Sequence, residues 1–343
     1  MRRSLTQAAA TLSLTAALGL AVSGCGGGDD DDAGSAAAKA PPKVHWTLVL
    51  DYQPNAVHAG IVRALRAGYF DDAGIDLKIV APASTSDALT QVGRGKAEVG
   101  LADLIDVARR NERADGATDG SGGVSLVGAV VQEPLSGILV SAKSPIKVPA
   151  DLAGKRIAVT GLPSDVAVVD AIARRDGKPV KTKQITLGFD GLKALDAGRV
   201  DGATAYWPAD EVTLKGLGTP PRTFSLSKDG GVHYPGLVAF TTPAIAKEQP
   251  EAVKAFAGAL EHGTRDVIAD PSLGEDAIGL EYPELDAAAT KAQLANYVPL
   301  FGTDATAGRI DDAALTRFAT FAAGSGLTKG VLTPAELRGT PAG

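Results

Sequence analysis

The sequence predicts an α/β fold made of two lobes of similar construction. From Val44 onward, short apolar runs typical of buried strands alternate with helical patterns of apolar residues. Residues 95–103 also resemble residues 198–206, since each segment reads as a helix end, a tight glycine turn and a short strand. The similarity predicts two like lobes, although a chance repeat of such turns within one α/β domain would look the same.

The first cycle of elements alternates regularly. We expect strands at residues 47–50, 77–80, 97–101 and 124–131 and helices at residues 57–67, 87–93 and 104–111. Gly68 stands where a left-handed residue commonly ends a helix. The glycine, serine and aspartate residues at 114–123 predict a surface loop.

A second cycle begins after Leu152, and the C-terminal part reads as mostly helical. We expect strands at residues 156–159, 184–187 and 202–206 and helices at residues 166–175, 191–196, 248–270, 286–297 and 311–323. Ligands of open α/β sheets lie beyond the carboxyl ends of the strands. Asp103 of one lobe is therefore expected to face Tyr206 and Trp207 of the other across a cleft.

Composition limits the class of partner. The 343 residues are 45% hydrophobic and 22% charged, which is typical of a soluble globular protein. The formal charge is −6, and it becomes −8 if Arg2 and Arg3 leave with a leader. An acidic chain argues against nucleic acid and favours a small neutral or cationic ligand. No apolar run after the leader approaches the roughly 20 residues of a membrane span.

The N-terminus predicts a lipid anchor. A basic start, an apolar run at residues 12–22 and small residues precede Cys25, the only cysteine. We expect residues 1–24 to be a bacterial lipoprotein signal peptide and Cys25 to be lipidated; a secretory signal with an incidental cysteine is the alternative. Residues 25–42 then form the lipidated cysteine and a flexible tether. The protein is expected at the outer face of the cell membrane, as a monomer without disulfides.

Several short segments resemble one protein family. The runs Leu-Asp-Tyr-Gln-Pro-Asn at 50–55, His-Ala-Gly-Ile at 58–61 and Ala-Gly-Tyr-Phe at 67–70 resemble the opening of the solute-binding proteins of ABC importers that carry pyrimidine precursors of thiamine. Residues 151–157 and 250–256 also occur in related sulfonate and nitrate binders, so they indicate only the superfamily. The resemblance covers residue 43 to about residue 337.

This resemblance implies a fold and partners. The fold is of the two-lobed type II periplasmic-binding-protein kind, with two crossing hinge strands near residues 138–141 and 237–241. Lobe 1 would comprise residues 43–138 and 240–343, and lobe 2 residues 139–239. An ABC permease and its ATPase subunits are the implied partners.

The same superfamily contains an enzyme, the fungal-type thiamine pyrimidine synthase. The resemblance implies that this enzyme uses a histidine, pyridoxal phosphate held on a lysine, and a cysteine-rich stretch associated with iron. Here Ala102 stands at the lysine position and Asp106 at the histidine position, and residues 233–240 contain no sulfur. We therefore expect a binding protein without enzymatic activity or cofactor.

An aminopyrimidine requires particular side chains. A carboxylate can form two hydrogen bonds to its amine and protonated ring nitrogen, and aromatic rings can stack on its faces. The candidate carboxylates are Asp51, Asp103, Asp165 and Glu211. The candidate stacking residues are Tyr52, Trp207 and Tyr234.

Further candidates have structural alternatives. Asn55 and Asp51 flank a proline turn and can cap the next helix instead, and backbone groups can satisfy His58. Ser164 and Asp165 open a helix, where either a ligand oxygen or a cap fits. Ser136 and Gly137 precede the first crossing and are expected to line the cleft. The histidines show no metal-ligand spacing, so no metal is expected.

We therefore expect an extracytoplasmic lipoprotein that captures a small heteroaromatic nutrient, a thiamine pyrimidine precursor of the hydroxymethylpyrimidine or formylaminopyrimidine type. Riboflavin, or a sulfonate or nitrate ion bound by the same fold, is the alternative cargo. A sensor or adhesion lipoprotein with the same fold is a third interpretation.

Overall fold

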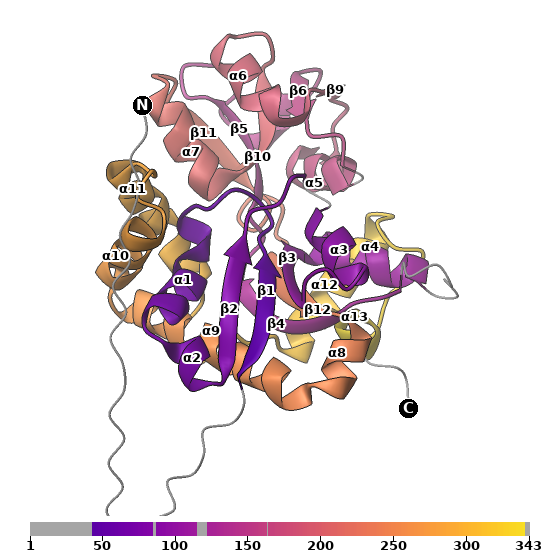
Figure 1. Cartoon of the computed structure of the whole chain (residues 1–343). Helices are drawn as coiled ribbons and strands as arrows, with labels where there is room; N and C mark the ends of the chain where they lie inside the picture. Colours follow the sequence, from indigo (N-terminus) through magenta and orange to yellow (C-terminus); the bar gives the residue numbers. More distant parts are fainter. Residues whose placement is uncertain (1–42, 85–86, 115–121, 163, 340–343) are drawn as a thin grey trace, which may run out of the picture. The chain divides into compact units, whose positions relative to one another are not determined.

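The computed structural model describes residues 43–84, 87–114, 122–162 and 164–339. The expected signal peptide, Cys25 and the tether lie outside the described residues. Residues 41–343 form one compact unit with its own hydrophobic core. The described strands are arranged in two five-stranded sheets and one small hairpin (Figure 1).

The first sheet has the strand order β2-β1-β3-β12-β4. Its strands are β1 (Val44–Val49), β2 (Ile75–Val80), β3 (Val99–Asp103), β4 (Ser125–Val131) and β12 (Leu237–Thr241). β1 runs parallel to β2 and β3, whereas β12 runs antiparallel to β3 and β4. Leu237 and Ala239 belong to one core cluster, and Val238 and Phe240 belong to another. Because successive side chains of a strand point to opposite faces, both faces of this sheet are covered.

The second sheet has the strand order β11-β5-β10-β6-β9. Its strands are β5 (Ser136–Ser141), β6 (Arg156–Val159), β9 (Lys183–Thr186), β10 (Gly202–Tyr206) and β11 (Pro221–Ser225). β6 runs parallel to β9 and β10, and β5 runs antiparallel to β10 and β11. The hairpin consists of β7 (Arg174–Arg175) and β8 (Lys178–Pro179).

The two sheets share one topology. The order β2-β1-β3-β12-β4 of the first sheet corresponds to the order β9-β6-β10-β5-β11 of the second. In both sheets the first three strands and the fifth run in one direction and the fourth runs in the opposite direction. The similar segments of the sequence fall on β3 and β10. Each strand follows a glycine in the left-handed region, Gly95 with φ 65° and Gly198 with φ 66°. The predicted α/β class and the repeated construction are confirmed.

The chain changes sheet earlier than the sequence suggested. We expected crossings near residues 138–141 and 237–241, but these residues lie inside β5 and β12. The connections between the sheets are residues 132–135 and 226–236. The segments at which we expected the crossings are apolar strands that pair with a neighbouring strand on each side. Leu237, for example, lies opposite Asp103 of β3 and Val131 of β4. The lobe boundaries drawn from the sequence stay a prediction.

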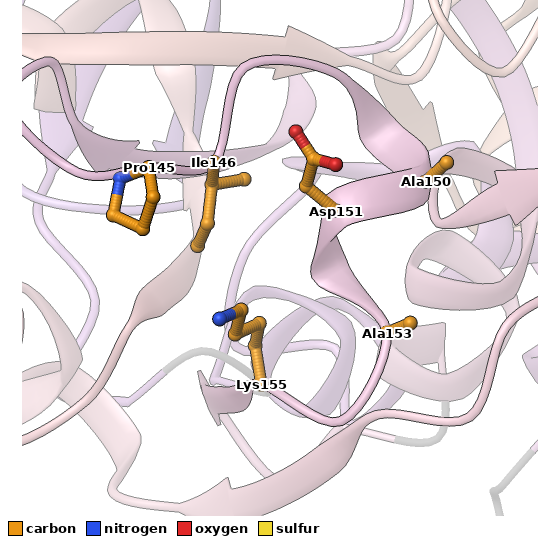
Figure 2. A pocket seen from close by; sticks show the side chains of 6 residues that line it. All are labelled: Pro145, Ile146, Ala150, Asp151, Ala153 and Lys155. Carbon is orange, nitrogen blue, oxygen red and sulfur yellow. The ribbon is translucent and has the colours of Figure 1, made fainter.

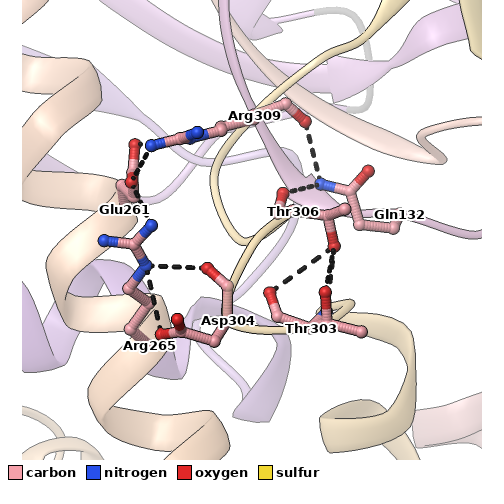
Figure 3. A network of polar contacts seen from close by, with 7 residues as sticks. All are labelled: Gln132, Glu261, Arg265, Thr303, Asp304, Thr306 and Arg309. Carbon is pink, nitrogen blue, oxygen red and sulfur yellow. Dashed lines mark hydrogen bonds and ion pairs between the residues drawn. The ribbon is translucent and has the colours of Figure 1, made fainter.

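The two connections pack against each other and against a loop. Nδ1 of His233 lies 2.9 Å from Oε2 of Glu133, which joins the second connection to the first. Nε2 of Gln132 donates to the backbone oxygens of Thr306, at 2.8 Å, and Arg309, at 2.9 Å (Figure 3). Arg309 is paired with Glu261 of α9 (Pro250–Ala269) at 2.7 Å. The first connection is therefore anchored to α9 through residues 302–309.

Helices cover both faces of the first sheet. One core cluster joins the sheet to α1 (Ala59–Arg66), α9, α10 (Pro271–Glu281) and α11 (Ala287–Tyr297). Another cluster includes α3 (Asp87–Gly93), α4 (Leu104–Ala114), α12 (Asp312–Gly324) and α13 (Pro334–Arg338). The shorter elements are α2 (Tyr69–Asp72), α8 (Pro243–Glu248) and the 3₁₀ turns η1 (Ala56–His58) and η4 (Val298–Leu300). None of the helices in the described part combines the length and apolarity that a membrane crossing needs.

The second sheet is also covered by helices. Residues of α5 (Ser164–Ile172) pack with Ile138 and Ile157 of the sheet. Residues of α6 (Gly191–Asp196) and α7 (Trp207–Gly216) pack with Leu139 and Ala203. The 3₁₀ turns are η2 (Pro149–Leu152) and η3 (Gly188–Asp190).

Candidate ligand-binding site

Two predicted carboxylates lie at the carboxyl ends of neighbouring strands. Asp103 is the last residue of β3, and Asp51 follows the end of β1 by two residues. β1 and β3 are parallel and paired, so these ends lie at one edge of the sheet. Asp103 is only 6% exposed, and its Oδ1 accepts a hydrogen bond of 2.8 Å from the backbone N–H of Ile105. The start of α4 thereby fixes this carboxyl group.

The end of the corresponding strand in the second sheet contacts Asp103. The hydroxyl group of Tyr206, the last residue of β10, donates to Oδ2 of Asp103 at 3.3 Å. The final residues of the two similar segments thus meet each other. The prediction that Asp103 faces Tyr206 is confirmed.

Asp51, Asp103, Asp106 and Tyr206 form what we call the acid cluster. Burial, and after it the neighbouring carboxylates of Asp106 and Asp51, raise the pKa of Asp103 to about 8. Burial also raises the pKa of Asp106, in the first turn of α4. The pKa of Tyr206 is raised well above its ordinary value, first by burial and then by the same three carboxylates. Crowded, poorly solvated carboxyl groups favour a ligand that brings N–H donors or positive charge.

His58 orients Asp51. Nε2 of His58 lies 2.8 Å from Oδ1 of Asp51, and the backbone N–H of Asn55 donates to Nδ1 at 3.2 Å. Because the backbone N–H can only donate, Nδ1 is an acceptor and Nε2 carries the proton given to Asp51. His58 is fully buried in this structure and positions Asp51, and its own contact with a ligand stays a prediction. Oδ1 of Asn55 accepts a hydrogen bond from the backbone N–H of Val57 at 2.9 Å. Asn55 therefore caps η1, as the structural alternative to a ligand contact predicted.

The three predicted stacking residues lie in different environments. Tyr52 is 46% exposed, so part of its ring is accessible. Trp207 is half-buried, and its Nε1 is buried with no hydrogen-bond partner among the described residues. Tyr234 is fully buried; its ring packs edge-on against Phe318, at 5.0 Å between centroids, and parallel to Phe321, at 6.0 Å. Its hydroxyl group is buried with no hydrogen-bond partner among the described residues, and burial, followed by the carboxylates of Asp103 and Asp106, raises its pKa. Ligand stacking by Tyr234 stays a prediction.

Ser136 and Gly137 lie beside the end of β10. Ser136 is the register partner of Tyr206 in the antiparallel pair of β5 and β10. A Cβ atom at Gly137 would lie 3.3 Å from Cβ of Trp207 and 3.0 Å from the backbone oxygen of Phe224. The small residue lets Trp207 approach β5 closely.

Asp165 and Glu211 have other partners. Oδ2 of Asp165 accepts hydrogen bonds from the backbone N–H of Gly161, at 2.7 Å, and from the hydroxyl group of Thr160, at 3.1 Å. These contacts close the turn from β6 to α5, which begins at the half-buried Ser164, and support the capping alternative. Glu211 accepts from Lys215 at 2.6 Å and from Thr223 at 2.9 Å, and its contact with a ligand stays a prediction. These bonds join α7 to β11.

The sequence interpretation missed two acidic residues. From the sequence, Asp106 was noted only because it stands at the position of the synthase's histidine. In the structure it lies in the acid cluster, three residues after Asp103. Oδ2 of Asp210 accepts from the backbone N–H of Tyr206 at 2.9 Å, and burial raises the pKa of Asp210 to about 6. An aspartate three or four residues after a strand end was the signal that could have identified both.

The carboxyl group of Asp103 is almost fully covered in this structure. Two surface hollows, of about 290 and 360 Å³, are lined by residues outside the cluster. Within the described ranges, no group of three histidine, cysteine, aspartate or glutamate residues is arranged to hold a metal ion. The ligand contacts of all twelve candidates stay predictions: Asp51, Tyr52, Asn55, His58, Asp103, Ser136, Gly137, Ser164, Asp165, Trp207, Glu211 and Tyr234.

The sequence matches the family described as NMT1/THI5 like over residues 55–273, more than half of the chain. The chain belongs to this family. The match includes both sheets apart from β1, and with them the strand ends at Asp103 and Tyr206, whereas Asp51 precedes the matched residues. The resemblance seen in the sequence is confirmed at the level of the family.

The relatives of this chain include proteins of two kinds, a binding protein and phosphate synthases. A formylaminopyrimidine-binding protein of Halalkalibacterium halodurans is 26% identical over 228 residues, which cover 65% of this chain and 66% of that protein. A 4-amino-5-hydroxymethyl-2-methylpyrimidine phosphate synthase of Legionella pneumophila is 24% identical over 242 residues, which cover 70% of this chain and 74% of that protein. A synthase of the same name from Saccharomyces cerevisiae is 25% identical over 236 residues, which cover 66% of this chain and 67% of that protein.

Solved structures establish the fold. The alkanesulfonate-binding protein SsuA of Xanthomonas axonopodis pv. citri, bound to MOPS, superposes with a TM-score of 0.66 at 18% identity and covers 86% of this chain and 98% of that one. The CA3427 gene product of Candida albicans, described as having the generic periplasmic binding protein fold, superposes with a TM-score of 0.60 at 13% identity, covering 86% and 93%. The predicted periplasmic-binding-protein fold is confirmed.

Proposed function

We propose that this protein is an extracytoplasmic substrate-binding lipoprotein of an ABC importer and that it captures a thiamine pyrimidine precursor. The observation that carries the proposal is the contact between Asp103 and Tyr206 inside the acid cluster. Carboxyl groups from one sheet meet a strand end of the other where ligands bind in open α/β sheets. The relationship to a formylaminopyrimidine-binding protein supports this cargo.

The chemistry of the acid cluster suits an aminopyrimidine. The protonated carboxyl group of Asp103 offers an O–H to a ring nitrogen and a carbonyl oxygen to the neighbouring amine; a carboxylate offers two acceptors to the protonated ring. Hydrogen bonds to charged groups contribute about 1.5–3 kcal/mol each, and a stack contributes about 1 kcal/mol. A few such contacts amount to the roughly 8 kcal/mol of micromolar affinity.

Binding without catalysis is the second part of the proposal. Ala102, at the position of the synthase's lysine by resemblance, ends in a methyl group that cannot form a Schiff base, and it is 6% exposed within β3. We expect no pyrimidine phosphate when the protein is incubated with pyridoxal phosphate and iron. Its formation would contradict the binding role and favour the synthases among the relatives.

Membrane anchoring through Cys25 is the third part. The basic start, the apolar run and the small residues before Cys25 support cleavage and lipidation there. Metabolic labelling of the full chain with a fatty acid should label the wild type but not Cys25→Ser. Label on both proteins would contradict the anchor. Docking of the monomer on a permease powered by an ATPase follows from this role.

Calorimetric titration of residues 41–343 tests the cargo. We expect micromolar or tighter binding of hydroxymethylpyrimidine or formylaminopyrimidine, and no binding of taurine or nitrate. Asp103→Asn should weaken binding at least tenfold, whereas the exposed carboxylate control Asp72→Asn should not change it. Binding of sulfonates alone, or of riboflavin alone, would replace this proposal by the corresponding alternative.

A second variant tests the predicted stacking. Trp207→Ala should weaken binding more than it lowers the free energy of unfolding. Equal losses of binding free energy and of unfolding free energy would mean that Trp207 serves only to pack against β5, which it approaches closely at Gly137.

A further inference from the structure

Positive charge is concentrated in one part of this acidic chain. Residues 143–183 contain nine lysine and arginine residues but only four aspartates, while the whole chain has a formal charge of −6. Of the four aspartates, Asp165 is 7% exposed and closes the turn described above. The charge is therefore strongly segregated, which is unexpected for random surface composition.

Backbone contacts bring these basic residues together. The backbone N–H of Gly154 donates to the oxygen of Lys181 at 2.7 Å, and that of Lys183 donates to the oxygen of Lys155 at 2.8 Å. The hairpin of β7 and β8 leads directly into this segment and also contacts η2. We define the basic patch as the side chains of Lys147, Lys155, Arg174, Lys178, Lys181 and Lys183.

The basic patch has few acidic neighbours: after Arg156, Lys155 helps to lower the pKa of Asp201, and Arg174 opposes the rise that burial causes in the pKa of Asp170. Five of its six side chains are exposed, Lys155 is half-buried, and none forms an ion pair within the described part of the chain. Asp151 lies beside Lys155 at a hollow of about 290 Å³ (Figure 2). Its Oδ2 accepts from the backbone N–H groups of Lys147, at 2.8 Å, and Val148, at 3.2 Å. This carboxylate is thus engaged in holding the turn at η2.

Apolar side chains are exposed next to these lysines. Val148, which follows Lys147, is 50% exposed, and Ile185, two residues after Lys183, is 36% exposed. The hollow is also lined by Pro145, Ile146 and Ala153 (Figure 2). Basic residues interleaved with exposed apolar ones fit a phospholipid interface, which offers anionic headgroups above acyl chains, better than an acidic protein surface, which offers charge alone.

The basic patch lies away from the acid cluster. β6 and β9 are parallel and begin at Arg156 and Lys183, which are register partners. The patch is therefore at the amino ends of these strands, whereas ligands are expected at the carboxyl ends. Lysines on an edge strand such as β9 also discourage strand pairing, but this accounts for Lys183 and not for Lys147, Lys155 or Arg174.

We propose that the basic patch binds the anionic phospholipid headgroups of a bilayer. The contact is electrostatic, with Val148 and Ile185 entering the interface. It holds the second sheet's amino-terminal edge toward the membrane and leaves the strand ends of the acid cluster away from it. The surface is distinct from the pyrimidine site and does not depend on Cys25.

Vesicle flotation of the unlipidated residues 41–343 tests the proposal, since this part forms one compact unit. The probes are vesicles of phosphatidylcholine alone and of phosphatidylcholine with 30% phosphatidylglycerol, at 50 mM and 500 mM NaCl. We expect binding only to the anionic vesicles at low salt, because salt screens surface charge. The triple variant Lys147→Gln, Lys181→Gln, Lys183→Gln should partition about 100-fold less, at about fivefold per lysine.

A matched triple variant controls for net charge. Lys78→Gln, Lys247→Gln, Lys254→Gln also removes three exposed lysines without ion pairs and should partition within a few-fold of the parent. Equal losses in the two variants, or no binding to anionic vesicles, would overturn the proposal. Capture on polyglutamate beads without vesicle binding would also overturn it, in favour of an acidic protein partner. Pyrimidine binding is measured separately and should be the same in both variants.

Discussion

Replacing Asp103 with asparagine should remove a large pH dependence of stability. Burial raises the pKa of Asp103 from the ordinary 3.8 to about 8. Between pH 5 and pH 7 the folded protein therefore keeps a proton that the unfolded chain has released. Folding takes up this proton, so the free energy of unfolding falls as pH rises from about 4 and stops falling above about pH 8.

The size of the effect follows from one proton. A difference of one bound proton changes the free energy of unfolding by about 1.4 kcal/mol per pH unit. From pH 5 to pH 7, Asp103 alone should lower the stability of the parent by about 3 kcal/mol. Asparagine has nearly the same shape, keeps an oxygen for the N–H of Ile105 and does not ionise. The variant should therefore gain about 3 kcal/mol on the parent over this interval.

Urea unfolding of residues 41–343 at pH 5, 6 and 7, followed by tryptophan fluorescence, measures this difference. Asp72→Asn, in an exposed carboxylate, is the control and should follow the parent at every pH. If the stabilities of Asp103→Asn and the parent run parallel with pH, Asp103 is ionised in the folded protein. The argument from burial would then be refuted.

Three further variants test the packing around the site. Tyr206→Phe loses the 3.3 Å hydrogen bond to Asp103 and should reduce the free energy of unfolding by about 0.5–1.5 kcal/mol in urea; no loss would mean that the bond does not hold the sheets. Gly263→Ala should cost about 3 kcal/mol by the same method, because its Cβ would lie 2.7 Å from Cβ of Ala64. Gln132→Ala should speed hydrogen exchange in residues 302–309 through loss of two hydrogen bonds; unchanged exchange would contradict the anchoring role.

Local pattern was enough to predict the repeated core and not enough to predict helices that begin at proline. The strands at 156–159 and 202–206 have the expected bounds, because their short apolar runs are bounded by glycine or charged residues. α7 and α10 were missed, since Pro208 and Pro271 were read as the end of structure although proline fits the first turn of a helix. The helix expected at 166–175 ends at Ile172, because Asp176 and Gly177 have positive φ and turn the chain into the hairpin.

The surroundings of a candidate site residue could not be predicted where they depend on long-range packing. Asp103 was predictable, because a strand end defines its position in any α/β sheet. Tyr234 was not, since its burial arises from Phe318 and Phe321, more than eighty residues away along the chain. Glu211 similarly found partners on its own helix and on β11. A residue type identifies what a side chain is able to bind, whereas tertiary contacts decide whether it is available.

The contact between Asp103 and Tyr206 has a consequence for ligand affinity. It joins the two sheets at the position where the ligand is proposed to bind. A ligand that engages Oδ2 of Asp103 must displace or share the hydroxyl group of Tyr206, so the measured affinity is the difference between two sets of hydrogen bonds. Because Asp210 holds the backbone of Tyr206, we expect the displaced hydroxyl group to stay within reach of the ligand. Tyr206 would then both hold Asp103 in the absence of ligand and contribute to binding.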